Sequence, residues 1–261
     1  MSTTRTRLAG FAKLATVGAL SALVAGGISA AADSSAQAHG HSHEPANVTT
    51  VKNDVKAYYG DTVDAAGHHH ASTDSLWAQD VQNQIAGAQR YLQERLRSHH
   101  LHNPALVLDV DDTSEVTYGW EVDVDFHYDP VSNEAAINAG AFPAIQPTLA
   151  LAKWAKAHGV KLYFITGRPE HQRAATLKDL ANDGYPTPDG AFLKYEGGNN
   201  PAYLPCAPTC TTIQYKSGTR KHIEEDLGSD IVVNVGDQFS DLDGGYADRG
   251  VKLPNPMYYL P

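Results

Sequence analysis

The chain has 261 residues, enough for one large domain or two small ones, and its 42% hydrophobic and 19% charged residues are typical of a folded protein. Acidic residues outnumber basic residues by 30 to 20, so the formal net charge is −10. This sign argues against a nucleic-acid-binding protein, because such proteins neutralise phosphates with Lys and Arg. Two cysteines are too few for a disulfide framework or a four-cysteine zinc site.

Residues 1–38 are predicted to be a secretory signal peptide. Arg5, Arg7 and Lys13 precede an uncharged run over residues 14–32, which is rich in Ala and Gly. The segment ends in Ala-Gln-Ala, which fits a cleavage site, and after cleavage we expect a secreted chain without a stable membrane span. The alternative is a membrane anchor, because the uncharged run has 19 residues and just reaches across a bilayer.

Residues 39–75 form a polar leader for which we expect weak order and flexibility. It contains His39, His41, His43 and three consecutive histidines at positions 68–70. Histidine tracts bind metal ions in some proteins, whereas histidines in a flexible leader are otherwise simply solvated. The sequence leaves both interpretations open.

Residues 76–261 are predicted to form an α/β domain with a mainly parallel sheet, because short apolar runs alternate with amphipathic segments. Three apolar runs predict buried strands, at residues 105–108, 161–165 and 231–235. Apolar residues three and four apart predict helices over residues 76–98, 145–158, 170–183 and 217–227. The proline-rich stretch 185–215 is expected to be a long irregular insertion at the rim of the site.

Cys206 and Cys210 lie within this insertion. A secreted protein matures in an oxidising compartment, so we expect the two thiols to form a small disulfide loop. Two free cysteines are the alternative.

Polar side chains follow each of the three predicted strands. Asp109, Asp111 and Asp112 follow the first strand, and the tripeptide 166–168, Thr-Gly-Arg, follows the second. The third strand is followed by the segment 236–241, Gly-Asp-Gln-Phe-Ser-Asp. Because parallel strands present their carboxyl ends at one edge of a sheet, we expect these groups to converge there.

The acidic run after the first strand points to a hard divalent cation, because clustered carboxylates repel one another when buried. A calcium loop of the EF-hand type does not fit. Counted from Asp109, that loop needs Gly and Glu where this chain has Ser114 and Trp120. Counted from Asp123, Tyr128 stands in place of the glycine.

Four motifs in this order resemble those of the haloacid dehalogenase (HAD) superfamily: Asp-Val-Asp-Asp-Thr at 109–113, Ile-Thr-Gly-Arg at 165–168, Lys216 leading into a helix, and Gly-Asp-Gln-Phe-Ser-Asp at 236–241. Within the superfamily, the chain resembles the class B and plant acid phosphatases that include the vegetative storage proteins. Three stretches carry this likeness, namely Phe-Ile-Thr-Gly-Arg-Pro-Glu, Tyr-Lys-Ser-Gly-Thr-Arg-Lys and the closing Leu-Pro-Asn-Pro-Met-Tyr-Tyr-Leu-Pro.

The resemblance covers about residues 76–261 and implies an HAD-like Rossmannoid three-layer fold, with a small cap inserted after the first motif at about residues 116–143. It also implies an enzyme that hydrolyses small phosphomonoesters through an aspartyl-phosphate intermediate. Asp109 would be the nucleophile. Asp111 would be the general acid and base, a role that needs a protonated carboxyl group and therefore suits an acid phosphatase.

The same resemblance implies an Mg²⁺ site. Its ligands would be Asp109, Asp237, the backbone carbonyl of Asp111, and Asp241 either directly or through water. Lys216 would neutralise charge on the phosphoryl group and position the nucleophile.

Thr166 and the backbone N–H of Gly167 would donate hydrogen bonds to the phosphoryl group. Arg168 would either contact the substrate as well or hold a carboxylate within the protein. The basic residues Arg220 and Lys221 lie one turn beyond Lys216 and are alternatives for its role.

The predicted cap is rich in acidic and aromatic residues. Its aromatic side chains, Trp120, Phe126 and Tyr128, would either stack on an aromatic leaving group or pack within the cap. Asp112 is expected to support the site, and Phe239 and Leu242 are expected in the core.

Two functions from different classes follow. The first is a secreted Mg²⁺-dependent acid phosphatase. The second is a non-catalytic secreted storage or metal-binding protein on the same fold. Because all four motifs keep their polar residues, the sequence favours the enzyme.

Overall fold

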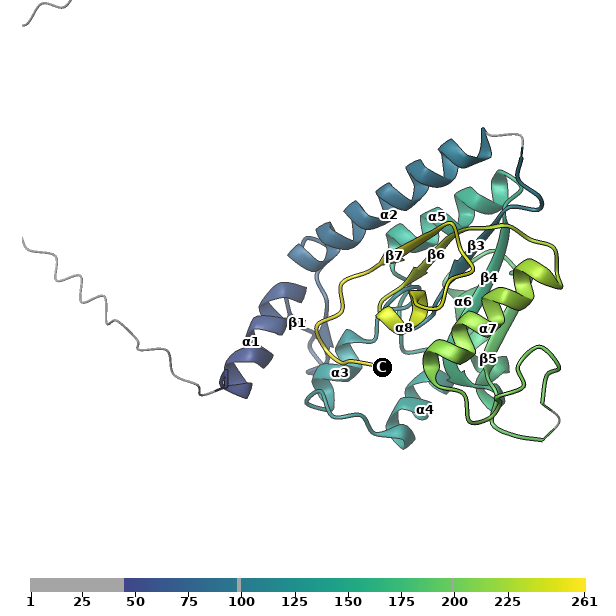
Figure 1. Cartoon of the computed structure of the whole chain (residues 1–261). Coiled ribbons are helices and arrows are strands. Elements are labelled where there is room, and N and C mark those ends of the chain that lie inside the picture. The colour runs from purple at the N-terminus through teal and green to yellow at the C-terminus, as the bar shows by residue number, and fades with distance from the viewer. Residues whose placement is uncertain (1–44, 98–99, 199) are drawn as a thin grey trace, which may run out of the picture. The chain divides into compact units, whose positions relative to one another are not determined.

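The computed structural model of the chain describes residues 45–97, 100–198 and 200–261 (Figure 1). The chain divides into two units, Met1–Pro45 and Ala46–Pro261. Almost all of the first unit lies outside the described residues, and so do the predicted signal peptide and His39, His41 and His43. The helices and strands given below belong to the second unit.

A sheet of five parallel strands forms the centre of this unit, in the order β5-β4-β3-β6-β7. The strands are β3 (Ala105–Leu108), β4 (Lys161–Pro169), β5 (Gly190–Lys194), β6 (Ile231–Gly236) and β7 (Arg249–Lys252). The three predicted strands are therefore confirmed as the middle of the sheet. The prediction missed β5, within the supposedly irregular insertion, and β7, because these edge strands are partly exposed and lack a continuous apolar run.

Helices cover the sheet and connect its strands. They are α1 (Val48–Tyr59), α2 (Leu76–Leu96), α3 (Tyr118–Asp123), α4 (Pro130–Ala139), α5 (Gln146–Ala157), α6 (Arg173–Asn182), α7 (Thr212–Glu225) and α8 (Phe239–Leu242), with a 3₁₀ turn η1 (Glu170–Gln172) before α6. The four predicted helices are confirmed as α2, α5, η1 with α6, and α7. The α/β fold with a parallel sheet is therefore as predicted.

Helix α7 begins five residues before the predicted start. Thr211 is its N-cap, and its side chain accepts from the backbone N–H of Gln214, whose own side chain accepts from the backbone N–H of Thr211. This reciprocal capping box satisfies two backbone groups that would otherwise lack partners. Lys216 therefore lies inside the helix, and the expectation that it leads into a helix was wrong.

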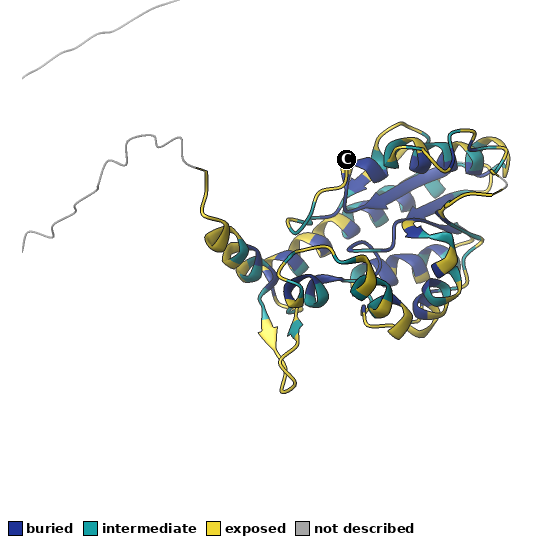
Figure 2. Cartoon of the chain, turned by 90° about the horizontal axis from the view of Figure 1, so that it is seen from below, coloured by how far each residue is buried: buried dark blue, intermediate teal, exposed yellow. Residues whose placement is uncertain are grey.

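Two hydrophobic cores lie on opposite faces of the sheet, because side chains alternate along a strand. Leu106 and Leu108 of β3 pack in the core that also contains Leu92 of α2. Val107 packs on the other face with Ile223 of α7. The sheet between these helical layers is buried throughout its centre (Figure 2).

Helix α1 lies in the segment expected to have weak order. Asn47 caps its start by accepting from the N–H of Thr50, and Gly60, with φ +61°, ends it. Val55 and Tyr59, four residues apart on one face, are buried in the core. The prediction missed this helix because only these two large apolar residues are buried in a polar sequence.

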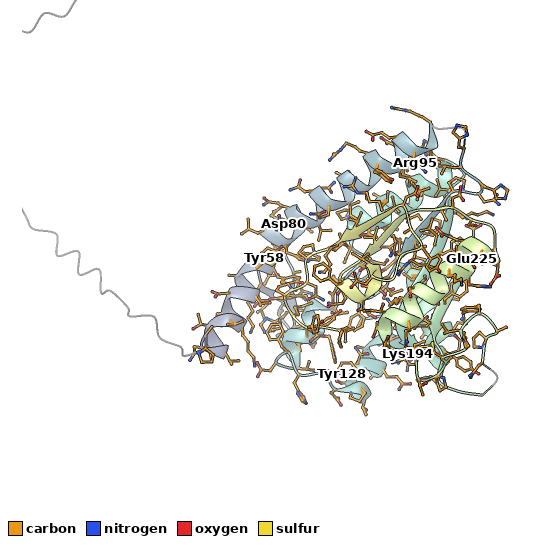
Figure 3. The ribbon with its side chains drawn as sticks, viewed as in Figure 1. Tyr58, Asp80, Arg95, Tyr128, Lys194 and Glu225 are labelled. Carbon is orange, nitrogen blue, oxygen red and sulfur yellow. A yellow bond between two sulfur atoms is a disulfide. The ribbon has the colours of Figure 1, made fainter. Side chains whose placement is uncertain are left out.

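Helix α1 is tied to the rest of the unit by aromatic stacking. The ring of Tyr59 lies 4.9 Å from that of Trp77 in α2 and 4.4 Å from that of Tyr118 in α3. Tyr58 donates a hydrogen bond of 2.8 Å to Asp80 of α2 (Figure 3). Both contacts connect the segment before the predicted domain to that domain.

A short hairpin of β1 (Thr62–Val63) and β2 (His69–His70) carries the histidine run. Its three histidines contact three different carboxylates: His68 with Asp123 at 3.2 Å, His69 with Asp61 at 2.8 Å and His70 with Asp64 at 3.1 Å. These three histidines thus pair with separate carboxylates and do not form one cluster.

Cys206 and Cys210 form the expected disulfide. None of the helices within residues 45–97, 100–198 and 200–261 combines the length and the apolar character that a membrane crossing needs.

Candidate active site

The first acidic loop begins where β3 ends. The backbone N–H of Asp109 donates to the carbonyl of Val235 in β6, and the hydroxyl of Ser114 donates to the carbonyl of Asp109. The N–H groups of Ser114 and Glu115 turn back onto the carbonyl of Val110, at 2.8 and 2.9 Å. This tight loop holds the Asp109 carboxylate at the sheet edge, with 7% of the residue exposed.

Asp112 supports the same loop, as expected. It adopts a left-handed backbone conformation, φ +52°, which Asp tolerates better than most residues. Its buried carboxylate accepts from the N–H of Thr117 at 3.0 Å, from the Thr117 hydroxyl at 2.6 Å and from the Tyr258 hydroxyl at 2.8 Å. Burial raises the pKa of Asp112 to about 7.

The second pair of acids follows β6. Asp237 directly succeeds the strand, and Asp241 lies on α8, where its Oδ2 accepts from the backbone N–H of Gln238 at 2.8 Å. The guanidinium of Arg220 donates to the carbonyls of Asp241 and Asp243, both at 2.5 Å. Arg220, fully buried, therefore holds this loop in place, and the exposed Lys221 pairs with Glu225 instead of entering the site.

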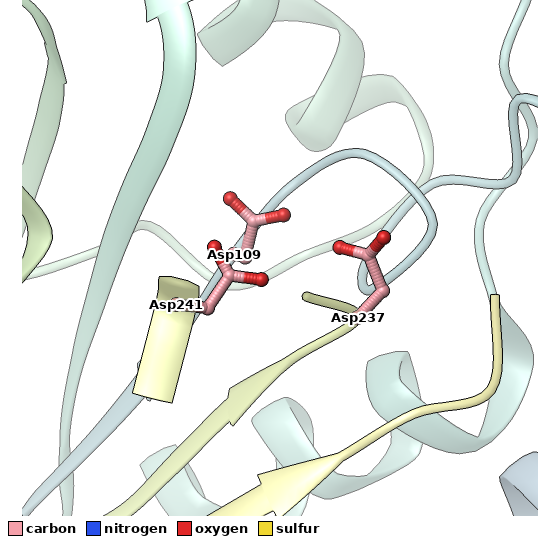
Figure 4. A group of neighbouring side chains, drawn as sticks. All are labelled: Asp109, Asp237 and Asp241. Carbon is pink, nitrogen blue, oxygen red and sulfur yellow. The ribbon is translucent and has the colours of Figure 1, made fainter. Parts of the chain in front are cut away.

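Asp109, Asp237 and Asp241 each place a carboxylate oxygen within 4.8 Å of the others (Figure 4). All three are buried, at 7, 2 and 4% exposure. Burial raises the pKa of Asp109 above its usual range, against the opposing charge of Lys216, and raises that of Asp237 to about 7. Three buried carboxylates repel one another when ionised. A hard divalent cation bound to their oxygens would offset that repulsion.

Lys216 is the cation that the chain itself supplies. Its Nζ lies 2.5 Å from Asp109 Oδ1, 2.7 Å from Asp241 Oδ1 and 3.0 Å from the carbonyl oxygen of Ile165. One ammonium group does not balance the charge of the three carboxylates, so this buried site keeps a net negative charge. The donor set therefore fits a second, divalent cation beside Lys216.

Arg168 holds carboxylates within the protein, which was one of its two expected roles. Its Nη2 donates to Asp111 Oδ1 at 2.7 Å and to Glu115 Oε2 at 2.6 Å. The arginine is 3% exposed, while the Asp111 side chain keeps 27% of its surface exposed. Asp111 thus points its carboxylate toward Arg168 and is not part of the trio around Asp237.

Thr166 and Gly167 lie at the same edge, but inside β4, because this strand continues to Pro169 and does not end at residue 165 as predicted. Thr166 is fully buried, and its hydroxyl oxygen accepts from the backbone N–H of Arg168 at 3.1 Å, so its proton is left for another acceptor. A Cβ placed on Gly167 would meet no atom within 4 Å, so the space beside this residue is open.

A pocket of about 630 Å³ lies over these groups. The floor of this pocket is polar and is formed by the site residues Asp109, Asp111, Gly167, Lys216 and Asp237. The segment around α3 and α4, where a cap was expected, contributes to its wall Phe126, Tyr128, Asn133 and Glu134. Its other walls come from the C-terminal segment and from Lys194 and Tyr215 in the region of the predicted insertion.

The aromatic residues of this segment divide into two groups. Phe126 and Tyr128 line the pocket. Trp120 packs edge-on against Tyr128 and Phe142, with ring centres 6.2 and 6.4 Å apart. Trp120 therefore packs within the segment, which was one of the two roles expected for its aromatic residues.

Glu121 of α3 also lines the pocket and is 6% exposed. Its carboxylate has no hydrogen-bond or ion-pair partner among residues 45–97, 100–198 and 200–261. Burial, and after it the charge of Asp111, raises the pKa of Glu121 to about 7.

Sequence reasoning missed several residues that hold the site. They are Glu115, Gln238, Asn255 and Tyr258, of which the last two lie in the closing stretch that carried the family resemblance. Phe239 was expected in the core and is instead 61% exposed, with Lys252 Nζ 5.5 Å from its ring centre. The short helix α8 turns this ring outward while it turns Asp241 inward. Leu242, also expected in the core, is only half-buried.

Known proteins resemble this chain in sequence and in fold. It is 36% identical over 163 residues to acid phosphatase 1 of Solanum lycopersicum, an alignment covering 59% of this chain and 58% of that protein. It is 32% identical over 103 residues to vegetative storage protein 2 of Arabidopsis thaliana, covering 40% and 35% of the two chains. Each alignment thus spans less than two thirds of the relative.

In fold, the chain is similar to the class C acid phosphatase from Bacillus anthracis, with a TM-score of 0.62 and 21% identity over 81% of this chain and 86% of that one. A family model for the acid phosphatases of the HAD superfamily, subfamily IIIB, matches residues 24–261. The chain therefore belongs to the subfamily IIIB acid phosphatase family of the HAD superfamily.

Proposed function

We propose that the protein is a secreted, Mg²⁺-dependent acid phosphatase that hydrolyses small phosphomonoesters through an aspartyl-phosphate on Asp109. The observation that carries this proposal is the approach of Asp109, Asp237 and Asp241 to within 4.8 Å, with Lys216 beside them. Family membership and the pocket of about 630 Å³ above these groups support a small phosphate ester as the substrate.

Asp109, Asp237 and Asp241 would hold Mg²⁺, with the backbone carbonyl of Asp111 as a further ligand. When bound, the ion supplies positive charge that lets a carboxylate approach a phosphate dianion. Lys216 orients Asp109 through Oδ1 and adds a second positive charge beside the phosphoryl group.

Asp109 attacks phosphorus, and the bond between phosphorus and the leaving oxygen breaks as the new O–P bond forms. Asp111 donates its proton to the leaving alcohol and then takes a proton from the water that releases inorganic phosphate. The partly exposed position of Asp111 beside the pocket supports this role, and Arg168 fixes the direction of its carboxylate.

Thr166 donates its hydroxyl proton to a phosphoryl oxygen, since its lone pair already accepts from Arg168. The backbone N–H of Gly167 is a second donor, and the open space beside it admits the ligand. The cap segment, at about residues 116–143, surrounds the leaving group. Phe126 and Tyr128 are the aromatic surfaces available there.

The test is hydrolysis of p-nitrophenyl phosphate by the purified protein at acidic pH. We expect turnover that EDTA abolishes, that Mg²⁺ restores, and that Asp109→Asn lowers by about 10³-fold or more. Asp54→Asn, at an exposed carboxylate of α1, is the matched control and should retain activity. Turnover insensitive to both EDTA and Asp109→Asn would discard the mechanism.

The same experiment decides between the enzyme and a non-catalytic storage protein. A protein that folds and binds Mg²⁺ but hydrolyses none of a panel of aromatic, sugar and nucleoside monophosphates would favour the alternative, a non-catalytic storage or metal-binding protein.

A further inference from the structure

The C-terminal segment from Leu253 to Leu260 contacts both acidic loops of the candidate site. It follows β7 and runs toward α3 before the chain ends (Figure 1, yellow). The proposed chemistry uses none of its side chains, yet its polar groups hydrogen-bond to the residues that surround the carboxylate trio. We call residues 253–260 the C-terminal strap.

Asn255 holds one oxygen of Asp237. Its Nδ2 donates to Asp237 Oδ2 at 2.7 Å, and Nε2 of Gln238 donates to the same oxygen, also at 2.7 Å. Two amide donors thus occupy Oδ2. The other oxygen, Oδ1, accepts only from the Thr113 hydroxyl, at 3.4 Å, among the described residues, so it is left to serve as a ligand.

The strap also fixes Gln238. The Oε1 of Gln238 accepts from the backbone N–H of Leu260 at 3.2 Å, and Ser240 of α8 donates to the carbonyl of Leu260 at 2.9 Å. The second amide that orients Asp237 is therefore itself held by the end of the chain. Asp237 depends on the strap twice, directly and through Gln238.

Tyr258 reaches the other acidic loop. Its hydroxyl donates to Asp112 Oδ2 at 2.8 Å, and Asp112 in turn accepts both hydrogen bonds from Thr117 at the start of α3. Asp112 follows Asp111 directly in the loop that carries Asp109. One short segment thus connects the loop after β3 with the loop after β6.

The strap is anchored where it leaves the sheet. The N–H of Leu253 donates to the carbonyl of Gly236 at 2.8 Å, and the indole of Trp77 donates to the carbonyl of Pro254 at 3.2 Å. Within the strap, Asn255 Oδ1 accepts from the N–H of Met257 at 2.9 Å, which leaves its Nδ2 to donate to Asp237. The amide therefore has one orientation available.

We propose that the C-terminal strap positions the cation ligands, and that Asn255 and Tyr258 are its two positioning residues. Groups that hydrogen-bond to metal ligands orient them, and their loss typically weakens metal binding. The proposal rests on the proposed function, because it takes Asp237 to be a ligand. It assigns to the closing stretch of the sequence a role in cation affinity rather than in substrate binding.

The test measures binding of Mn²⁺ alone, as a paramagnetic substitute for Mg²⁺, by electron paramagnetic resonance of the unbound ion. We expect Asn255→Ala to raise the Mn²⁺ Kd by about tenfold or more, and Tyr258→Phe by about two- to fivefold. Asn53→Ala, at an exposed amide of α1, and Tyr91→Phe, at a partly exposed tyrosine of α2, are matched controls and should leave the Kd unchanged.

Steady-state kinetics give a second readout, with KM measured at saturating Mg²⁺ and the rate then measured as a function of Mg²⁺ concentration. Substrate KM should stay within about twofold of the wild-type value in both strap variants, while the Mg²⁺ concentration for half-maximal rate rises in step with the Mn²⁺ Kd. Thermal unfolding verifies that each variant is folded. If Asn255→Ala does not fold, Tyr258→Phe decides alone, because it removes one hydroxyl and keeps the ring.

Unchanged Mn²⁺ affinity in the folded strap variants, with normal wild-type binding, would overturn this inference and leave the proposed function intact. A wild-type protein that binds no Mn²⁺ would instead overturn the proposed function.

Discussion

The Nζ of Lys216 lies 2.5 Å from Oδ1 of Asp109, although 107 positions separate the two residues in the chain. Both are buried, and the ammonium fills its three donor positions with Asp109, Asp241 and the carbonyl of Ile165. Burial alone would lower the pKa of Lys216, but the two carboxylates raise it above its usual value. The group is therefore charged across the working pH range.

Lys216→Met should destabilise the fold, because it leaves two buried carboxylates without their partner. We expect a loss of about 3–5 kcal/mol in the free energy of unfolding at pH 7 in EDTA, measured by urea denaturation. Lys221→Met, at an exposed lysine of the same helix, is the control and should change stability by less than about 1 kcal/mol. Equal stability of the two variants would contradict a structural ion pair at this position.

Arg168→Lys should lower kcat while leaving KM nearly unchanged. A lysine cannot reproduce the guanidinium fork that holds Asp111 and Glu115 together, so the general acid would lose its orientation. We expect kcat to fall about 10- to 100-fold, measured with p-nitrophenyl phosphate at saturating Mg²⁺. Arg173→Lys, at a partly exposed arginine paired with Glu170, is the control. A raised KM with intact kcat would instead place Arg168 on the substrate.

Thr166→Val should remove one donor to the phosphoryl group without changing the volume of the side chain much. We expect kcat to fall by about 10²-fold, as for other single donors that stabilise a transition state. Thr166→Ser keeps the hydroxyl and should recover most of the rate. If serine fails to rescue, packing of the methyl group rather than hydrogen bonding would explain the loss.

Glu121→Gln should change the pH dependence of kcat/KM. Burial raises the pKa of Glu121 to about 7, so the carboxyl is neutral at acidic pH and becomes an anion as the pH rises through 7. That anion faces the pocket and repels a phosphate dianion. Between pH 6 and pH 8, kcat/KM should decrease in both proteins. The fold decrease should be about three to ten times larger in wild type than in Glu121→Gln.

The measurement is kcat/KM from steady-state rates across this pH range. Glu94→Gln, at an exposed glutamate of α2, is the control. Parallel pH profiles in wild type and Glu121→Gln would show that Glu121 does not act on the incoming phosphate.

The strands that carry the site were predictable because they are buried on both faces and read as continuous apolar runs. Residues 105–108 and 231–235 were located in this way, and the carboxylates after them were assigned to one sheet edge from topology alone. Edge strands β5 and β7 lack that pattern because one side of each is partly exposed. Helix α1 was missed for a related reason, since its burial depends on partners far along the chain.

The roles of polar side chains were harder to predict than the positions of the strands. Arg168 and Arg220 are both basic residues beside a motif, yet one pairs with Asp111 and the other donates to backbone carbonyls of the loop after β6. Nothing local distinguishes them, because a guanidinium takes whichever acceptors the fold places within reach.

By itself the sequence determined the family, the order of the central strands along the chain, and which acids follow them, since these depend on local hydrophobic pattern and on motifs. The tertiary structure alone decided that Asp111 turns to Arg168, that Phe239 faces outward, and that the strap ends beside Asp237. Hydrogen bonds across long separations need two segments already brought together, and that proximity is a property of the packed chain rather than of any one stretch of it.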